Sequence, residues 1–244
     1  MKRKVCPFLI TNIVFDVDDT LYDQQAPFEA AVLKISPHVL PEDMHPLYLR
    51  FRHYSDENFP KVMAGKWTLE QMRSHRIAES LKDLDYPQLT LEECLTFQKV
   101  YEDELANITM HQEVKKTLDY LKEKKIPIGI ITNGPTDHQF KKIKQLAVEN
   151  WVHPDHIIIS QATGFQKPEP EIFYLAEKNF SLVGKNTLYV GDNFDSDVTG
   201  SKNSGWHSLW FNHRQRKVPE GKSPIFDFEI NSFNQLFETI QAIF

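Results

Sequence analysis

Short runs of apolar residues recur along the second half of the chain, and each is followed by a segment whose apolar positions have helical spacing. The runs predict strands over residues 126–131, 156–159, 187–190 and 207–211, and an edge strand over 226–230. The spacing predicts helices over residues 114–124, 136–147, 169–178, 196–203 and 233–243. Strands that alternate with helices in this way predict a parallel, doubly wound α/β sheet with right-handed crossovers.

An earlier apolar run, residues 10–15, has the composition of a strand that is buried on both faces, and we expect it to join the same sheet. The stretch from 23 to 106, by contrast, contains helical patterns and no convincing strand. The sequence therefore predicts a Rossmann-like core formed by residues 1–22 and 107–244, interrupted by a helical domain inserted over residues 23–106.

Local features predict where the helices of the inserted segment begin and end. Thr68 and Gln71 form a capping-box pattern, which predicts the start of a helix. Pro60 is expected to end the preceding helix at residue 59, because proline has no N–H with which to continue the hydrogen-bond ladder. Helices are expected over residues 27–35, 47–59 and 91–105.

The composition is that of an ordinary globular protein, with 41% hydrophobic and 25% charged residues. The 28 basic and 34 acidic residues give a net charge of −6, which argues against a nucleic-acid polymer or an anionic membrane surface as the partner. Cys6 and Cys94 lack metal-ligand spacing, so neither a disulfide framework nor a structural zinc site is expected. No apolar segment approaches the roughly 20 residues that span a bilayer, and no signal-peptide core is found, which predicts a cytoplasmic protein.

Three carboxylates follow the first apolar run at once, at Asp16, Asp18 and Asp19. Burial of an unpaired carboxylate costs several kcal/mol, so such a cluster needs paired cations or a metal ion. The carboxyl ends of strands are also where open α/β sheets bind ligands. The alternative is a solvated acidic turn after an edge strand.

Polar groups suited to a phosphate occur at two later places in the chain. Thr132, Asn133 and Gly134 place a hydroxyl and two backbone N–H groups before a predicted helix, where anions bind readily. An ordinary helix N-cap is the alternative. Lys167 precedes Pro168 in a loop that proline stiffens, although a lone surface lysine is the commoner case.

A second acidic cluster follows the predicted strand at 187–190 and contains Asp192, Asp195 and Asp197. The alternative for this cluster is an acidic helix N-terminus, which the helix dipole favours. For Asp195 a helix N-cap is the preferred interpretation.

Taken together, these groups fit the transfer of a phosphoryl group. Carboxylates from two strand ends can share one Mg²⁺, a cation that prefers carboxylate, water and phosphate oxygens, and leave one carboxylate free to attack phosphorus. Lys167 and the Thr132 hydroxyl would stabilise charge on the transferring group. A second carboxyl group, two residues from the nucleophile, would protonate the leaving oxygen and then deprotonate the attacking water.

The segments 16–20, 132–134, 167–168 and 191–197 resemble, in this order, the four motifs of the haloacid dehalogenase-like (HAD) hydrolase superfamily. The helical insert resembles the helical cap of that superfamily's first cap class. The resemblance implies that Asp16 is the nucleophile, which forms an aspartyl-phosphate, and that Asp18 is the general acid/base. It further implies phosphate binding by Thr132, Asn133 and Lys167, Mg²⁺ ligation by Asp16, the Asp18 backbone carbonyl and Asp192, and support of the metal shell by Asp197.

The resemblance thus implies a Mg²⁺-dependent phosphomonoesterase that acts on a small phosphorylated metabolite. Dehalogenases lack an acid at the position of Asp18, because they have no alkoxide to protonate, so phosphate chemistry is favoured. The size of the cap and its aromatic and basic residues favour a nucleoside monophosphate, as for a 5′-nucleotidase. A phosphomutase of the same superfamily, a receiver-type phospho-acceptor and a non-catalytic phosphate-binding protein are the alternatives.

Several cap residues are candidates for substrate contacts. The cations are Lys61, Arg73 and Arg76, and the candidate stacking surfaces are Phe51, Tyr54 and Trp67. The alternative is that the arginines face solvent on a helix surface and the aromatic rings fill the core of the cap. The sequence indicates no particular oligomeric state.

Overall fold

The computed structural model describes residues 8–244, so Cys6 lies outside the described residues. The chain divides into two compact units. One comprises the described residues up to Asp23 together with Thr109–Phe244, and the other is Gln24–Ile108. Among the described residues, no helix is both long enough and apolar enough to cross a membrane.

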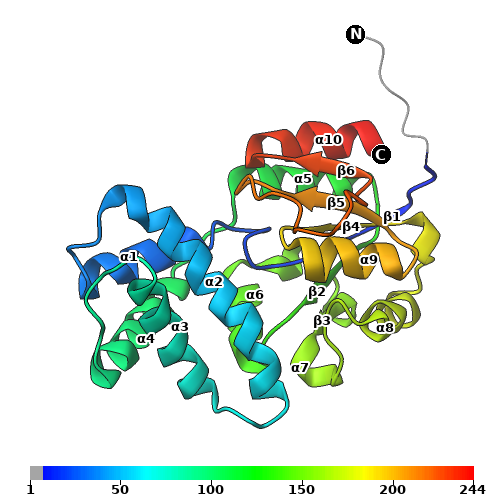
Figure 1. Ribbon diagram of the computed structural model, residues 1–244. Helices are drawn as coiled ribbons and strands as arrows, with labels where there is room; N and C mark the ends of the chain where they lie inside the picture. The colour runs from blue at the N-terminus through cyan, green and yellow to red at the C-terminus, as the bar shows by residue number, and fades with distance from the viewer. Residues whose placement is uncertain (1–7) are drawn as a thin grey trace. The chain divides into compact units, whose positions relative to one another are not determined.

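The first unit is built on a six-stranded parallel sheet with the strand order β3-β2-β1-β4-β5-β6 (Figure 1). The strands are β1 (Asn12–Phe15), β2 (Ile128–Thr132), β3 (Ile157–Ile159), β4 (Thr187–Gly191), β5 (His207–Phe211) and β6 (Phe228–Ile230). β6 pairs with β5 at the edge of the sheet, as its position in the sequence predicts. The predicted α/β, doubly wound parallel fold is confirmed.

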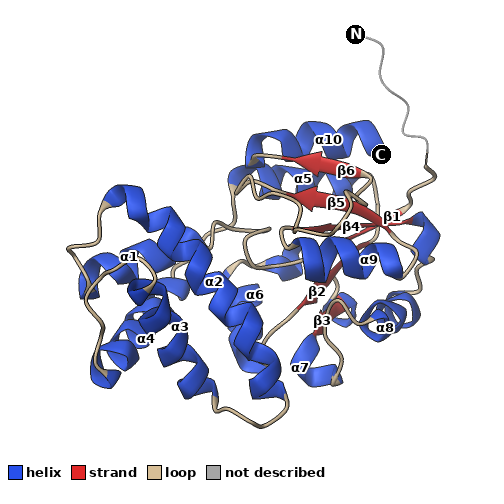
Figure 2. Cartoon of the chain, viewed as in Figure 1, coloured by secondary structure: helices blue, strands red, loops and turns tan. Residues whose placement is uncertain are grey.

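Helices cover both faces of this sheet (Figure 2). On one face α5 (Gln112–Glu123) packs against α10 (Leu236–Ile243), and on the other α8 (Pro170–Phe180) packs against α9 (Gly200–Asn203). Two more helices, α6 (Thr136–Gln145) and the short α7 (Ser160–Thr163), flank β3 in the chain. Parallel strands require such crossover connections, and their right-handed sense distributes the helices over the two faces.

β1 lies between β2 and β4, which explains why its residues are almost all apolar. Val14 is fully buried and pairs in register with Gly129 of β2 and Tyr189 of β4. Because the strands are parallel, their carboxyl ends meet at one edge of the sheet. Asp16 after β1, the last residues of β2 and Asp192 after β4 are therefore brought to the same edge.

The second unit contains four helices and, over Gln24–Ile108, all of which is described, no strand. They are α1 (Gln25–Ile35), α2 (Pro41–Met63), α3 (Leu69–Lys82) and α4 (Leu91–Leu105). The predicted capping box of Thr68 and Gln71 is confirmed at the start of α3. An equivalent box at Thr90 and Glu93 begins α4. Each box satisfies two N–H groups that would otherwise lack partners at a helix start.

Several predicted helix boundaries were wrong, and α2 begins at Pro41, six residues before the predicted start at residue 47. Pro60 does not end α2, which continues to Met63, because proline removes its own N–H but its carbonyl still accepts from Ala64 N at 3.0 Å. The segment predicted as one helix over 196–203 is instead a π-helical turn, Phe194–Thr199, followed by α9. Wide turns of this kind often occur at functional sites, and this one carries Asp197.

Candidate functional site

Lys167 joins the first and second acidic clusters. Its ammonium group is 2.8 Å from Asp16 Oδ1 and 2.6 Å from Asp197 Oδ1, and it also donates to the Tyr189 hydroxyl at 2.8 Å. All four side chains are buried, and Lys167 itself is 4% exposed. A buried ammonium is tolerated only with such partners, and the two carboxylates raise the pKa of Lys167 well above its usual value although burial opposes this. Lys167 is therefore part of the site and not the lone surface lysine of the alternative interpretation.

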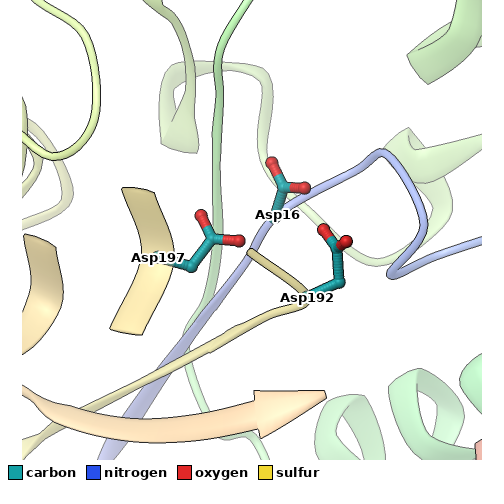
Figure 3. A group of neighbouring side chains, drawn as sticks. All are labelled: Asp16, Asp192 and Asp197. Atoms are coloured by element: carbon teal, nitrogen blue, oxygen red, sulfur yellow. The ribbon is translucent and has the colours of Figure 1, made fainter. Parts of the chain in front are cut away.

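The carboxylates of Asp16, Asp192 and Asp197 face a common space although they come from three different segments (Figure 3). One oxygen from each lies within 4.8 Å of the other two. Burial raises the pKa of Asp16 to about 8, with Lys167 lowering it and Asp197 and Asp192 raising it further. Excess negative charge in a buried oxygen-rich group is relieved by a hard divalent cation, so these residues fit Mg²⁺.

The carboxylates Asp192 and Asp197 of the second cluster are both bound by other groups of the protein. Asp197 uses both oxygens within the protein, because Oδ2 accepts from Asn193 N at 2.9 Å while Oδ1 binds Lys167. Gly191 makes room for it, since a Cβ at Gly191 would lie 2.4 Å from Asp197 Oδ2. Asp192 forms an ion pair with Arg216. Asp197 does lie in the first turn of the π-helical segment, as the alternative interpretation has it, but it is buried and paired with Lys167.

The N-cap interpretation of Asp195 was wrong. The side chain of Asn193 is the cap, because its Oδ1 accepts from Asp195 N at 2.9 Å and from Ser196 N at 3.0 Å. Asparagine is as good a cap as aspartate, and its position two residues earlier matches the start of the π-helical turn. Asp195 is exposed and pairs with Lys222 at 2.5 Å.

The end of β2 and the residue after it contribute the Thr132 hydroxyl and the Asn133 side chain, which holds the backbone of Lys167. Thr132 is buried and its Oγ1 has no hydrogen-bond partner among the described residues, as expected of a group that awaits a ligand oxygen. Asn133 Nδ2 donates to Lys167 O at 2.8 Å, and Asn133 Oδ1 accepts from Lys167 N at 2.9 Å. The Gly134 N–H, predicted to be available to a phosphate, instead donates to Ser160 Oγ at 3.0 Å. Ser160 is the first residue of α7, and its hydroxyl oxygen lies close enough to accept the hydrogen bond from this N–H group.

Asp18 is held by residues that the sequence did not single out. Lys142 Nζ lies 2.6 Å from Asp18 Oδ1 and 2.8 Å from Oδ2. Gln139 Nε2 donates to Oδ2 at 2.9 Å, and the Tyr22 hydroxyl donates to Oδ1 at 2.7 Å. Gln139 and Lys142 are three residues apart on α6, a spacing that places both side chains on one face of the helix. This spacing is the sequence signal that could have linked them, and it is too common to mark a site.

Asp19 has φ +56°, a left-handed conformation that aspartate tolerates better than most residues. Arg214 donates to both of its oxygens, at 2.8 and 3.1 Å, and pairs with Asp23 as well. Burial by itself would raise the pKa of Asp19, but hydrogen bonds from His213 and Arg214 hold it well below its usual range. His213 and Arg214, the first residues after Asn212 in the loop that follows β5, thus anchor this turn.

The comparison with known proteins agrees with this geometry. Residues 10–205 match the family of haloacid dehalogenase-like hydrolases. The chain belongs to this family. It is 30% identical over 212 residues to the glyceraldehyde 3-phosphate phosphatase of Pyrococcus abyssi, covering 84% of this chain and 82% of that protein. It is 26% identical to the N-acylneuraminate-9-phosphatase of Homo sapiens over 62% of this chain and 59% of that protein.

Among solved structures, the HAD-hydrolase YfnB of Bacillus subtilis, bound to magnesium, superposes with a TM-score of 0.69. The sequence identity is 22%, and the alignment covers 95% of this chain and 98% of that one. At this identity the likeness concerns the fold. The family match shows that the chain is a hydrolase of the HAD family, and its buried acidic cluster could hold a metal ion.

In the helical unit of this HAD hydrolase, some of the candidate substrate-contacting residues are buried and others are partly exposed. Phe51 is fully buried beside Phe28, so it fills the core of the unit and is not a stacking surface. Arg73 pairs with Glu102 at 3.0 Å. Arg76 is buried and does not face solvent, since its guanidinium lies 4.1 Å from the centre of the Phe51 ring. The alternative interpretation, that aromatic rings fill the core of the unit, is thus correct for Phe51. Its other half, that the arginines face solvent, is wrong for Arg76.

Two further cap candidates contact each other. Lys61 lies over the Trp67 ring, with its ammonium 4.7 Å from the ring centre. The Tyr54 hydroxyl donates to Asp83 Oδ2 at 2.9 Å. These three side chains are only half-buried, so they remain candidates for contact with a ligand.

Proposed function

We propose that this HAD hydrolase is a Mg²⁺-dependent phosphatase that hydrolyses a small phosphomonoester through an aspartyl-phosphate on Asp16. The observation that carries the proposal is the position of Asp16, whose carboxylate is bound by Lys167 and lies in a group with Asp192 and Asp197. The names of the relatives, which are phosphatases of small phosphorylated compounds, support it. The unit Gln24–Ile108 would be the cap and the other unit the catalytic core.

In the first half of the reaction an Asp16 carboxylate oxygen attacks phosphorus, and the bond from phosphorus to the leaving oxygen breaks. Asp18 gives its proton to the leaving oxygen, so that the product departs as an alcohol. In the second half Asp18 takes a proton from water, which attacks phosphorus and releases inorganic phosphate and Asp16. The same carboxyl group thus serves as acid and then as base.

Three other residues would bind the phosphoryl group. Lys167 supplies positive charge beside the nucleophile, and the unpaired Thr132 hydroxyl donates to a phosphoryl oxygen. Asn133 would act through its backbone N–H, because its side chain is used to hold the Lys167 backbone. Positioning and charge of this kind supply most of the catalysis in phosphoryl transfer.

The metal site would be formed by Asp16, Asp192 and the backbone carbonyl of Asp18, with Asp197 supporting it from behind. Asp197 suits the supporting role, since Lys167 and the Asn193 N–H already occupy both its oxygens. Mg²⁺ bound there would neutralise the acidic group and the phosphoryl oxygens.

The substrate class is a small phosphorylated metabolite, with triose and sugar phosphates favoured by the relatives' names. A nucleoside monophosphate, the substrate that the cap composition favoured, loses one of its supports because Phe51 is buried. A panel of triose, sugar and nucleoside monophosphates, assayed for released inorganic phosphate, separates the two classes.

The decisive experiment measures phosphate release from that panel and from p-nitrophenyl phosphate, with Mg²⁺, with EDTA and for Asp16→Asn. We expect turnover that requires Mg²⁺ and is lost in Asp16→Asn. Conversion of one sugar phosphate into its isomer without release of phosphate would instead support the phosphomutase. Binding of phosphate compounds without any turnover would support the phospho-acceptor or the non-catalytic binding protein.

A further inference from the structure

Several hydrogen bonds from described residues converge on the carboxylate of Asp18. Lys142 contributes two of them, one to each oxygen, and Gln139 and the Tyr22 hydroxyl contribute one each. We call Tyr22, Gln139 and Lys142 the Asp18 cluster. All three are buried, at 1%, 3% and 3% exposure.

These contacts fix the direction in which Asp18 points. An ionised carboxylate has about four acceptor positions, two on each oxygen. Oδ1 receives Lys142 and Tyr22, and Oδ2 receives Lys142 and Gln139, so both oxygens are doubly engaged. Rotation of the carboxylate would break several of these bonds at once, and hydrogen bonds to a charged group are stronger than those between neutral groups.

The cluster is itself held by the segment that follows β2. Gln139 Nε2 also donates to the Asn133 carbonyl oxygen at 3.0 Å. Gly134 leaves the space for this side chain, because a Cβ at Gly134 would lie 2.7 Å from Gln139 Nε2. The Asn133–Gly134 turn that borders the proposed phosphate site therefore also sets the position of the group that orients Asp18.

Burial of Lys142 is costly unless the charge has a specific use. A buried ammonium loses its hydration and must be paired with a negative charge. Lys144, two residues along α6, shows the ordinary arrangement, with a side chain 54% exposed and 3.3 Å from Glu149. Of Lys142 and Lys144, only Lys142 is buried, and it forms an ion pair with Asp18.

We propose that Lys142, with Gln139 and Tyr22, is a positioning residue that holds the Asp18 carboxyl group in line for proton transfer to the leaving oxygen. The inference rests on the proposed function of Asp18. In the acid step Asp18 is protonated: the oxygen that carries the proton gives up its ammonium contact and donates its O–H to the leaving oxygen, while the other oxygen keeps Lys142. The carboxyl group then stays in place as the proton is transferred.

This role predicts a dependence on the leaving group. An alkyl phosphate needs a proton on its leaving oxygen, whereas p-nitrophenolate departs as a stable anion. General acid catalysis typically contributes ~10²–10⁴-fold, so loss of its positioning lowers alkyl turnover by about tenfold or more. The ratio kcat/KM covers the steps up to formation of the aspartyl-phosphate, and it therefore isolates the acid role of Asp18 from its later role as base.

The experiment compares kcat/KM for p-nitrophenyl phosphate and for an alkyl phosphomonoester that the wild type hydrolyses. The variants are Lys142→Met, Tyr22→Phe, which removes only one hydroxyl, and Asp18→Asn as the limit of acid loss. Lys144→Met is the matched control. We expect Lys142→Met to lower the alkyl value at least tenfold more than the aryl value, Tyr22→Phe to lower it in the same direction by less, and Lys144→Met to change neither.

An equal loss for both substrates would overturn the inference and assign Lys142 to phosphate binding or to folding. Unchanged kinetics in Lys142→Met would overturn it as well. If Lys142→Met does not fold, the same ratio measured for Tyr22→Phe decides the matter. Failure of the proposed function is recognised separately, because the wild type itself would then release no phosphate from any ester. The inference can still be tested in that case by a crystal structure of Lys142→Met. An Asp18 carboxyl group in its wild-type position there would overturn the inference.

Discussion

Arg216 forms an ion pair with Asp192, a carboxylate of the proposed metal site. The two residues are far apart in sequence, on the loop after β5 and at the end of β4. The guanidinium is 29% exposed and the carboxylate 8%. Arg216 therefore partly neutralises a group that would also be neutralised by a bound cation, and the two cations compete for the same negative charge.

Replacement of Arg216 by glutamine is expected to tighten Mg²⁺ binding about 1.4- to fivefold, because a partly exposed ion pair contributes ~0.2–1 kcal/mol. Calorimetric titration with Mg²⁺ measures this directly. Lys217→Gln removes the same charge from an exposed neighbour and serves as the control. Weaker binding in Arg216→Gln would mean that the arginine helps to build the site.

Replacement of Lys167 by methionine is expected to abolish phosphatase activity and to lower the free energy of unfolding by about 3–5 kcal/mol. The physical reason is that Asp16 and Asp197 would be left buried without their shared cation. Chemical denaturation with and without Mg²⁺ measures the effect, and Mg²⁺ should restore part of the loss. An unchanged free energy of unfolding would show that the two carboxylates do not depend on Lys167.

Replacement of Gly191 by alanine should displace Asp197, since the added Cβ would lie 2.4 Å from its Oδ2. Because that carboxylate binds Lys167, we expect a fall in kcat of about 100-fold, the scale on which a misplaced active-site group acts. Stopped assays of phosphate release and circular dichroism separate lost activity from lost folding. Near-normal kcat in a folded variant would contradict the close approach of Gly191 to Asp197.

Replacement of Asn133 by alanine removes both hydrogen bonds to the Lys167 backbone. Two such bonds contribute ~1–3 kcal/mol in total, so kcat should fall about 5- to 150-fold while Mg²⁺ affinity stays unchanged. Steady-state kinetics and a Mg²⁺ titration measure the two quantities. Asn179→Ala, an exposed asparagine on α8, is the control and should behave as the wild type. A parallel loss of Mg²⁺ affinity would argue against a role confined to the Lys167 loop.

Much of the fold could be predicted from local pattern. Apolar runs such as Ile13–Phe15, each followed by an amphipathic segment, predicted the parallel sheet, because a strand covered on both faces has no polar side to show. The capping box at Thr68 was likewise local and correct. The continuation of α2 past Pro60 was missed, since local propensity yields to packing along the rest of the helix.

The sequence by itself determined the α/β class, the family and which carboxylates end the strands, because these depend on residues that are neighbours in the chain. Only the tertiary structure decided which cations meet them. Nothing in the segment Lys141–Lys144 marks Lys142 as the buried one, and nothing around Arg216 points to Asp192. Such pairings join residues more than twenty positions apart. They depend on how α6 and the loop after β5 pack against the edge of the sheet, and the spacing of residues within a short segment carries no information about that packing.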